Sequence, residues 1–391
     1  MSAGILQHTT RKRQAVLKPK VQPPTRVAVL GAGSWGTTFA KILADGGADV
    51  VLWARRPELA KEISEARRNS DYLQGINLPA GLTATSSLEE ALRGAEQVFV
   101  SVPSQSLREN LIAAEPFLAP DAIIVSLMKG VERATGLRMS EVIAEVLPIS
   151  PDKIAAISGP NLALEIAKEQ PTAAVVSSAS LETAQAVAML ASNKYFRSYV
   201  NTDVIGTEFG GVLKNLIAVA IGIVDGVGYG ENTKASIITR GLVEMTDFAV
   251  AYGAQAETLA GLAGLGDLIA TCQSPLSRNN TAGRLLGQGY SYNDVVKQMQ
   301  QTTEGLASVK PILELAKARG VEMPIVEQVR QVLDGTLAPR DIAPHLTTDT
   351  GQPQGERTID DGQAHGSAAL WGAFKRTFDQ LRHSGRSAGG N

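Results

Sequence analysis

Two lysines and one aspartate stand in apolar surroundings, where a charge is costly to bury. Lys214 interrupts the apolar segment GGVLKNLIAVAIG, Lys129 follows IIVSLM, and Asp267 lies within GLAGLGDLIATC. A lysine in such a stretch should be paired or used, and a buried lysine titrates nearer neutral pH than an exposed one. We therefore expect Lys214 to transfer a proton, with Asp267 as a partner. The alternative is that Lys214 sits at a domain edge and reaches solvent.

A dense group of hydrogen-bond donors follows in the segment SRNN at residues 277–280. Arg278 beside Asn279 suits the oxygens of a phosphate, and Lys129 could meet the same phosphate or a developing oxyanion. Further along, Glu304 precedes Gly305 at the start of a helical pattern. The alternatives are a loop turn for the first segment, a solvated surface lysine for Lys129 and a simple first-turn charge for Glu304.

Three glycines follow a short apolar segment near the N-terminus. In VAVLGAGSWG, Gly31, Gly33 and Gly36 have the spacing G-x-G-x-x-G, and TTFAKILA has a helical pattern. A strand, a glycine turn and a helix in this order are typical of a site for a dinucleotide. Gly31 allows the tight turn, Gly33 lets the backbone approach the pyrophosphate, and Gly36 lets the helix pack closely. The alternative is a tight turn without a ligand.

The next apolar segment, VVLWARR, ends in Arg55 and Arg56. Folds selective for NAD usually place an acidic residue here, which bonds the ribose hydroxyls, whereas arginines can pair with a ribose 2′-phosphate. The sequence therefore favours NADPH over NADH. Two solvated arginines in a loop are the alternative.

A further glycine turn occurs in ISGPNLALEIA. Gly159 and Pro160 end a strand pattern, Asn161 is a suitable helix cap, and a helix should begin at Leu162. Strand ends of this kind border the ligand crevice of an open sheet, so this helix start could face an anion. A purely structural cap is the alternative.

Composition excludes several classes of function. The chain has 391 residues and a net charge of −2, which gives no broad basic surface for nucleic acid. No apolar run looks long enough to span a bilayer. The only cysteine, Cys272, excludes an internal disulfide and fits a reducing, cytoplasmic location. All four histidines are near the ends, so we expect no histidine acid or base and no metal site: His8, His345, His365 and His383.

Strand and helix patterns alternate from residue 26 to about residue 202. This alternation is typical of an α/β protein with a doubly wound, mostly parallel sheet of the Rossmann type, and it predicts a dinucleotide-binding domain over residues 26–202. The expected strands cover residues 27–30, 49–53, 97–102, 122–126, 153–157, 173–177 and 195–200.

Strand patterns are absent from residues 203–338, which predict an all-α domain that carries substrate and catalytic groups. Small residues that suit close helix crossings recur in its first segment: Gly210, Gly211, Ala218, Ala220 and Gly222.

Both ends of the chain differ from its body. Residues 1–25 are basic and contain no acidic residue, which predicts a disordered arm or an organelle transit peptide. Residues 339–391 predict a mostly disordered tail. Within it, residues 368–382 place Trp371, Phe374, Phe378 and Leu381 on one helical face. Such a face would dock on the body, on a partner or weakly on a membrane surface.

Several of these segments, in order from about residue 26 to residue 337, resemble one family. They are GAGSWG, the Lys-Gly after the crevice strand, SGPNLA, GGVLKN, AGLGDLIATC, SRNN and TEG. The chain resembles the soluble NAD(P)-dependent glycerol-3-phosphate dehydrogenases of the bacterial and cyanobacterial type. The resemblance implies reversible reduction of dihydroxyacetone phosphate to sn-glycerol 3-phosphate for phospholipid synthesis. Together with Arg55 and Arg56, it leads us to expect NADPH as the preferred cofactor, with NADH accepted. A homodimer is a further expectation.

The resemblance also implies roles for residues. Lys214 matches the catalytic lysine, which gives a proton to the carbonyl oxygen. The expected substrate contacts are Lys129, Gly159, Asn161, Lys214, Asp267, Ser277, Arg278 and Asn279. The expected cofactor contacts are Gly31, Gly33, Ser34, Trp35, Gly36, Arg55, Arg56, Lys129, Ala163, Arg278, Thr302 and Glu304. Two features depart from the family pattern: Asn161 and Leu162 stand where many members have Ser or Thr and then Phe, and the position of Arg55 varies among members.

Two other functions compete with this one. A related two-domain reductase for hydroxyacids or ketopantoate also carries a lysine, often followed by Asn, on a helix after the nucleotide domain, although the SRNN segment favours a phosphorylated substrate. A nucleotide-sensing protein without turnover would keep the glycine turn but has no use for a pair between Lys214 and Asp267.

Overall fold

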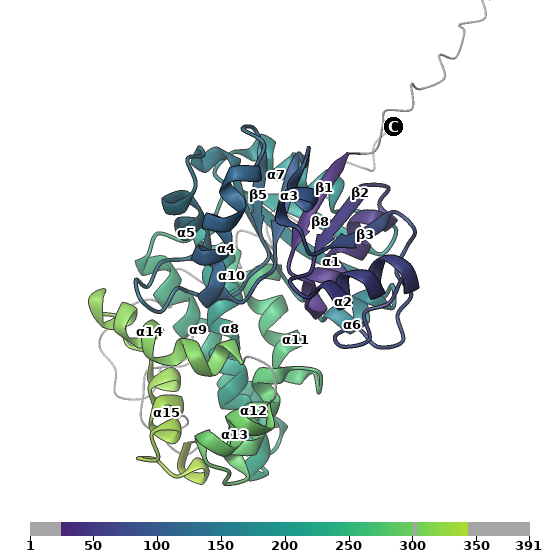
Figure 1. Cartoon of the computed structure of the whole chain (residues 1–391). Coiled ribbons are helices and arrows are strands. Elements are labelled where there is room, and N and C mark those ends of the chain that lie inside the picture. Colours follow the sequence, from purple (N-terminus) through teal and green to yellow (C-terminus); the bar gives the residue numbers. More distant parts are fainter. Residues whose placement is uncertain (1–24, 300–302, 343–391) are drawn as a thin grey trace, which may run out of the picture.

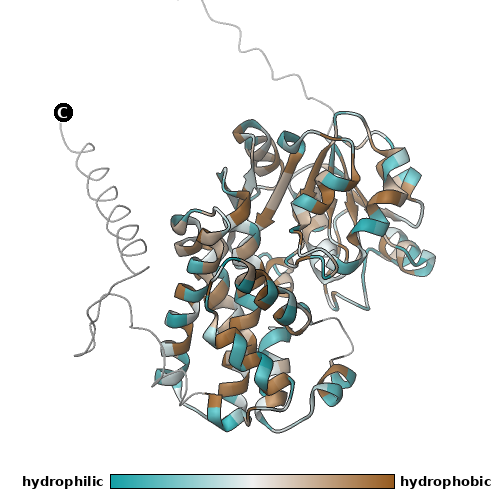
Figure 2. Cartoon of the chain, turned by 90° about the vertical axis from the view of Figure 1, so that its left-hand side faces the viewer, coloured by the Kyte–Doolittle hydropathy of each residue, from teal (hydrophilic) through white to brown (hydrophobic). Residues whose placement is uncertain are grey.

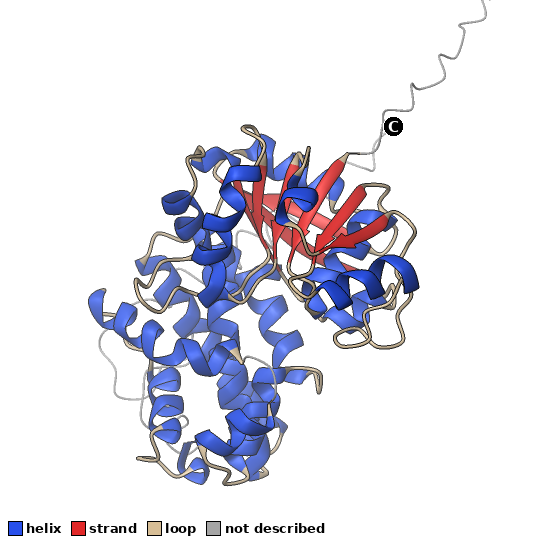
Figure 3. Ribbon diagram, in the orientation of Figure 1, coloured by secondary structure: helices blue, strands red, loops and turns tan. Residues whose placement is uncertain are grey.

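The computed structural model of the protein describes residues 25–299 and 303–342 (Figure 1). Thr302, residues 1–24 of the predicted basic arm and the predicted helix at residues 368–382 lie outside this part. The described chain forms a sheet with flanking helices at one end and a set of helices at the other (Figure 3). The predicted fold class, a Rossmann-type sheet followed by an all-α part, is confirmed.

The sheet has eight strands in the order β3-β2-β1-β4-β5-β6-β7-β8, and the first six are parallel. Chain order reverses between β1 and β4, which is where ligands bind in open sheets. The bounds are β1 Arg26–Leu30, β2 Asp49–Trp53, β3 Leu82–Thr85, β4 Gln97–Val100, β5 Ile123–Ser126, β6 Ile154–Ser158, β7 Thr172–Ser178 and β8 Phe196–Asn201.

Two features of the sheet differ from or refine the sequence prediction. Strand β3 was missed because it has only four residues, of which Leu82 and Thr85 alone are buried. Strand β7 runs antiparallel to β6, with Ala155 opposite Ser178, and β8 is parallel to β7. The sheet is therefore mostly but not wholly parallel, as predicted.

Helices cover both faces of the sheet and bury two separate apolar layers. Phe39 from α1 and Phe99 from β4 lie in one layer, and Leu107 from α4 lies in the other. The helices over the first face are α1 Ser34–Asp45, α2 Pro57–Lys61, the π-helix η1 Glu62–Ala66, α6 Ala163–Ala167 and α7 Leu181–Leu190. Those over the second are α3 Leu88–Leu92, α4 Leu107–Ala114 and α5 Met139–Val146.

The helical part is built around α8, Val204–Val227, whose residues are almost all buried. The other helices of this part are α9 Glu231–Ala251, α10 Ala256–Ala260, η5 Leu262–Gly266, α11 Asp267–Gln273, α12 Arg278–Gly287, α13 Tyr292–Gln298, α14 Glu304–Ala318 and α15 Pro324–Leu333. Apolar and polar residues alternate along the helices of this part (Figure 2). The short helix η6 (Pro339–Asp341) follows, and Ile342 is fully buried in this core. Packed chain thus extends past the predicted boundary at residue 338.

By length and composition alone, α8 qualifies as a membrane-spanning helix, and it is the one such helix in the described chain. The expectation that no apolar run is long enough was therefore wrong. Of its most apolar window, 83% is buried inside the protein, because the other helices pack around it.

Glycines let α8 and α12 cross at backbone contact. A Cβ added at Gly222 would lie 2.1 Å from the carbonyl oxygen of Asn280, and one at Gly283 would lie 2.1 Å from that of Val219. Gly226 and Gly287 extend the same contact by one helical turn, at 2.2 Å each. This approach places the start of α12 beside the middle of α8, where Lys214 lies. The predicted role of small residues in close crossings is confirmed for Gly222.

We expect Gly222→Ala to destabilise the protein by about 1–3 kcal/mol, because the new methyl group meets rigid backbone and this cost exceeds the gain in helix propensity. Gly230→Ala is the matched control, since no atom lies within 4 Å of a Cβ there. Thermal unfolding measures both variants. Equal melting temperatures for the two variants would contradict the close-crossing argument.

Candidate active site

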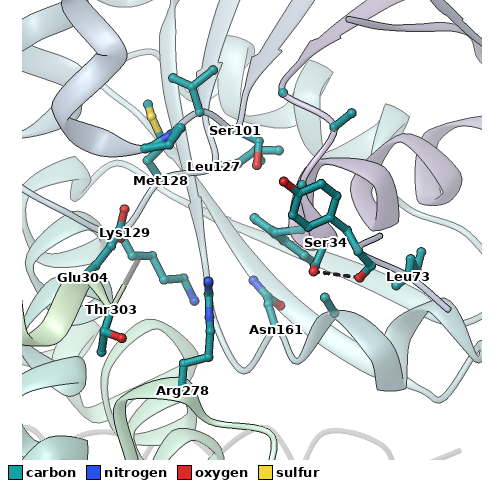
Figure 4. Close-up of a pocket in the computed structure, with 18 of the residues that line it drawn as sticks. Ser34, Leu73, Ser101, Leu127, Met128, Lys129, Asn161, Arg278, Thr303 and Glu304 are labelled. Atoms are coloured by element: carbon teal, nitrogen blue, oxygen red, sulfur yellow. Dashed lines mark hydrogen bonds between the residues drawn. The ribbon is translucent and has the colours of Figure 1, made fainter. Parts of the chain in front are cut away.

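A cleft of about 1070 Å³ lies between the carboxyl ends of the sheet strands and the helical part. Lys129, Asn161 and Arg278 extend toward its centre from three different segments (Figure 4). Fourteen predicted site residues line it: Gly31, Gly33, Ser34, Trp35, Arg55, Arg56, Lys129, Asn161, Ala163, Lys214, Ser277, Arg278, Asn279 and Glu304. Gly36, Gly159 and Asp267 do not line the cleft directly but contact residues that do.

The glycine turn after β1 is built as its spacing predicts. Gly31 has φ +112°, and a Cβ there would lie 2.4 Å from the carbonyl oxygen of Ser101. A Cβ at Gly36 would lie 1.9 Å from the carbonyl oxygen of Gly31, so only glycine lets α1 approach. A Cβ at Gly33, in contrast, would meet no protein atom within 4 Å. The backbone at Gly33 therefore faces open space in the cleft, where a diphosphate can reach the start of α1.

The two arginines after β2 line the outer end of the cleft but have different surroundings. The Arg56 guanidinium pairs with the Asp71 carboxylate, and both side chains are 52% exposed. Asp71 raises the pKa of Arg56 through this hydrogen bond. No ion pair or hydrogen bond joins the Arg55 side chain to any residue of the described chain. Sequence reasoning missed Asp71, because it lies 15 positions after Arg56 on a segment with no regular pattern.

At the inner end of the cleft, one buried carboxylate holds two lysines. Asp267 accepts a hydrogen bond from Lys129 Nζ at 2.5 Å through Oδ2, and its Oδ1 lies 2.9 Å from Lys214 Nζ. The side chains of Asp267, Lys214 and Lys129 are 2%, 9% and 14% exposed. Lys129 also donates to the carbonyl oxygen of Gly159 at 2.9 Å. The expected pair between Lys214 and Asp267 is thus present, and the trio carries a net charge of +1.

Burial changes the protonation of this cluster. Loss of solvent lowers the pKa of Lys129 to about 8, because removal from water opposes the ammonium form more strongly than Asp267 favours it. The nearby charge of Lys214 lowers it further. Lys129 therefore changes charge within the physiological range of pH, which an exposed lysine does not.

Two polar side chains beside this cluster, Thr271 and Asn215, were given no role by the sequence prediction. Thr271 Oγ1 accepts from Lys214 Nζ at 2.6 Å and donates to Asp267 Oδ1 at 3.2 Å. The spacing of four residues between Asp267 and Thr271, one turn of α11, is the signal that could have found it. Asn215 accepts from Asn279 Nδ2 at 2.8 Å and so ties α8 to α12.

The residues of the segment SRNN form the start of α12, and Ser277, Arg278 and Asn279 also line the cleft. Ser277 caps α12 by accepting from the backbone N–H of Asn280 at 3.2 Å, and the Asn280 side chain donates to the carbonyl oxygen of Cys272. Arg278 and Asn279 line the cleft at the first turn of α12. A guanidinium at a helix start is a favourable site for a phosphate.

Glu304 closes the cleft on the helical side. It is the first residue of α14, and its carboxylate accepts from Ser104 Oγ at 3.1 Å, so it joins the helical part to the sheet. Burial raises the pKa of Glu304, although Ser104 and the charge of Arg278 oppose the shift.

The prediction that Asn161 caps a helix is wrong. Helix α6 begins at Ala163, its capping position is Leu162, and no side chain caps it. The Asn161 amide is buried, and neither its nitrogen nor its oxygen has a hydrogen-bond partner in the structure. The buried ring nitrogen of Trp35 and the hydroxyl of Thr303, both at the cleft, are also without a partner. Such atoms cost stability unless a ligand satisfies them.

These features fit a nicotinamide dinucleotide. The cleft offers open backbone at the glycine turn, cations at its outer end and unsatisfied polar atoms at its centre.

In residues 25–299 and 303–342, no group of three or more His, Cys, Asp or Glu side chains could hold a metal ion.

Comparison with known protein families agrees with this geometry. A family model described as the N-terminus of NAD-dependent glycerol-3-phosphate dehydrogenase matches residues 26–184, and one described as its C-terminus matches residues 203–344. The chain belongs to the NAD-dependent glycerol-3-phosphate dehydrogenase family.

Individual relatives are similar over most of their length. A glycerol-3-phosphate dehydrogenase (NAD(P)+) from Leifsonia xyli is 77% identical over 365 residues, which cover 92% of this chain and 99% of the relative. One from Thermobifida fusca is 52% identical, with 84% and 98% covered. The crystal structure of glycerol-3-phosphate dehydrogenase from Coxiella burnetii has a TM-score of 0.79 and 35% identity, and covers 84% of this chain and all of that one.

Family membership decides between the competing functions. The chain is an NAD(P)-dependent oxidoreductase, so a sensor without turnover is excluded. The matched family is not that of the ketopantoate reductases. The roles of individual residues follow from the geometry of the cleft and are taken up below.

We expect Asp267→Asn to destabilise the protein by about 3–5 kcal/mol, because two buried ammonium groups lose their shared carboxylate. The loss is largest at low pH, where Lys129 is charged in both proteins. It shrinks as the pH rises toward about 8 and is constant above it, because the variant, without the carboxylate, loses the Lys129 proton at a lower pH than the wild type does.

Chemical denaturation between pH 6 and pH 9 measures this dependence. Asp225→Asn is the control, since it breaks a more exposed pair with Lys234 near the C-terminal end of α8. A loss for Asp267→Asn that stays constant over this range would contradict the assignment.

Proposed function

We propose that the protein reduces dihydroxyacetone phosphate to sn-glycerol 3-phosphate, reversibly, with NADPH preferred and NADH accepted. The observation that carries this proposal is the Lys214 ammonium, held by Asp267 and Thr271 at the wall of a cleft that also contains a glycine turn. A small phosphorylated ketone needs a proton donor, a phosphate site and a cofactor site in one cavity, and this cleft offers groups for all three.

The substrate phosphate would lie at the first turn of α12. Arg278 and Asn279 line the cleft there, and Lys129 extends toward Arg278 from the sheet side (Figure 4). The Asn161 amide, buried without a partner, can bond either the phosphate or the substrate hydroxyl. This arrangement favours a phosphorylated substrate over a simple 2-keto acid, because a carboxylate needs fewer donors and less charge.

Lys214 would carry the proton transfer. When bound, the reduced nicotinamide supplies the hydride to the carbonyl carbon. The carbonyl oxygen takes a proton from Lys214 Nζ as its negative charge develops, so the C=O bond becomes C–OH and the lysine becomes a neutral amine. In the reverse direction the neutral amine accepts the hydroxyl proton. Asp267 and Thr271 hold Nζ in one place, so that little reorganisation precedes the step.

The remaining expectations about the protein also belong to this proposal. Glycerol 3-phosphate would serve phospholipid synthesis in the cytoplasm. The dinucleotide-binding domain would cover residues 26–202 and the catalytic domain residues 203–338. A homodimer, and a partner or membrane contact through residues 368–382, stay predictions from the sequence.

We expect Lys214→Ala to lower kcat for dihydroxyacetone phosphate by about 10²–10⁴-fold, the usual contribution of a positioned acid. The affinity for NADPH should change by less than about threefold, since the outer end of the cleft is intact. Lys310→Ala on the exposed side of α14 is the control. Absorbance at 340 nm follows turnover, and fluorescence titration follows binding. If Lys214→Ala keeps full activity, Lys214 is not the proton donor.

We expect Arg55→Asp to shift the preference from NADPH toward NADH by about tenfold or more, because a carboxylate repels a 2′-phosphate and accepts a hydrogen bond from a 2′-hydroxyl. Steady-state kcat/KM with each cofactor measures the ratio. If the ratio is the same in the variant and the wild type, Arg55 does not contact the 2′-phosphate.

A further inference from the structure

The outer end of the cleft contains an acidic side chain that the cofactor assignment does not use. Asp71 lines the cleft beside Arg55 and Arg56, and its carboxylate binds the Arg56 guanidinium. The Tyr72 ring centroid lies 6.0 Å from the guanidinium carbon of Arg56. Arg56 is therefore held on two sides by neighbouring residues of one segment.

This segment is fastened to the glycine turn by buried contacts. The side chain of Asn69, which is 1% exposed, donates to the carbonyl oxygen of Ala32 at 3.0 Å and to Thr37 Oγ1 at 2.8 Å. Ser34 Oγ donates to the carbonyl oxygen of Tyr72 at 2.8 Å, the contact drawn in Figure 4. Asp71 lies between these anchors, so the backbone that carries it is fastened to the dinucleotide turn on both sides.

We propose that Asp71 determines the cofactor preference of this protein by tethering Arg56 away from the ribose 2′ position. The tether leaves Arg55 as the cation for a 2′-phosphate, and it places a carboxylate where the ribose of a cofactor without that phosphate can be bonded. Other dinucleotide folds carry the acidic acceptor for the ribose at the end of the second strand. Here Asp71, from a later segment, supplies that acceptor. One site then tolerates both NADPH and NADH.

The charge balance gives the direction of the effect. Arg55, Arg56 and Asp71 sum to +1, whereas the two arginines alone would sum to +2. The second arginine strengthens the binding of a phosphate dianion, and the carboxylate weakens it. The binding of a neutral ribose hydroxyl is strengthened only by the carboxylate. Removing the carboxylate should therefore strengthen NADPH binding and leave NADH binding unchanged or weaker.

The test measures binding without substrate, by quenching of the tryptophan fluorescence of Trp35 and Trp53, which line the cleft. We expect Asp71→Asn to raise the ratio of Kd for NADH to Kd for NADPH about fivefold, the size expected for releasing one exposed ion pair. In the double variant Asp71→Asn with Arg56→Ala, most of that gain should be lost. Calorimetry with adenosine 2′,5′-bisphosphate and with AMP should show the same change for the 2′-phosphate alone.

Asp49→Asn is the matched control, since it breaks another Arg–Asp pair, with Arg26, at the opposite end of the same strand β2. A ratio of Kd for NADH to Kd for NADPH in Asp71→Asn that stays within twofold of the wild-type ratio would overturn the proposal. So would a double variant, Asp71→Asn with Arg56→Ala, that keeps the full increase in this ratio. The inference rests on the cofactor site of the proposed function, but not on the substrate. A protein that binds both cofactors and ignores dihydroxyacetone phosphate would refute the proposed reaction alone.

Discussion

The structure depends on one buried carboxylate that two ammonium groups share. Asp267 is held rigidly at the start of α11 and bonds Lys129 from the sheet and Lys214 from α8. Burial of either ammonium group without a carboxylate partner would destabilise the folded protein. The segment after β5 and helix α8 do not by themselves fix where the two ammonium groups lie. The pairing thus joins the two halves of the chain and leaves one net positive charge facing the cleft. That charge suits an anionic substrate and a developing alkoxide.

Local patterns predicted much of the fold. The glycine turn, the alternation of strands and helices and the all-helical second half follow from apolar periodicity and turn residues, which act over a few positions. The pairing of Lys214 with Asp267 was also foreseen, because charges inside apolar segments need partners. The short strand β3 and the uncapped start of α6 were not foreseen, since β3 pairs with β2 and α6 packs against α1, and both partners are distant in sequence.

The residues of the candidate site divide in the same way, into those that a local pattern predicts and those that depend on contacts distant in sequence. Residues within a motif, such as Gly31 and Arg278, were predicted as site residues from their segments, and both line the cleft. Thr271 and Asp71 were missed, because what makes them relevant is a contact across the fold and not a pattern along the chain. The segment VVLWARR alone therefore did not predict the net charge at the outer end of the cleft. That charge includes the carboxylate of Asp71, fifteen residues after Arg56.

The central claim is that the Lys214 ammonium, positioned by Asp267, meets the carbonyl oxygen of a phosphorylated ketone beside the nicotinamide. A crystal structure of the complex with NADP+ and glycerol 3-phosphate tests this most directly. The account predicts Lys214 Nζ within about 3 Å of the C2 oxygen, with Asp267 still bonded to it and the phosphate at Arg278. A C2 oxygen bonded instead by another side chain, with Lys214 turned away from the ligand, would contradict it.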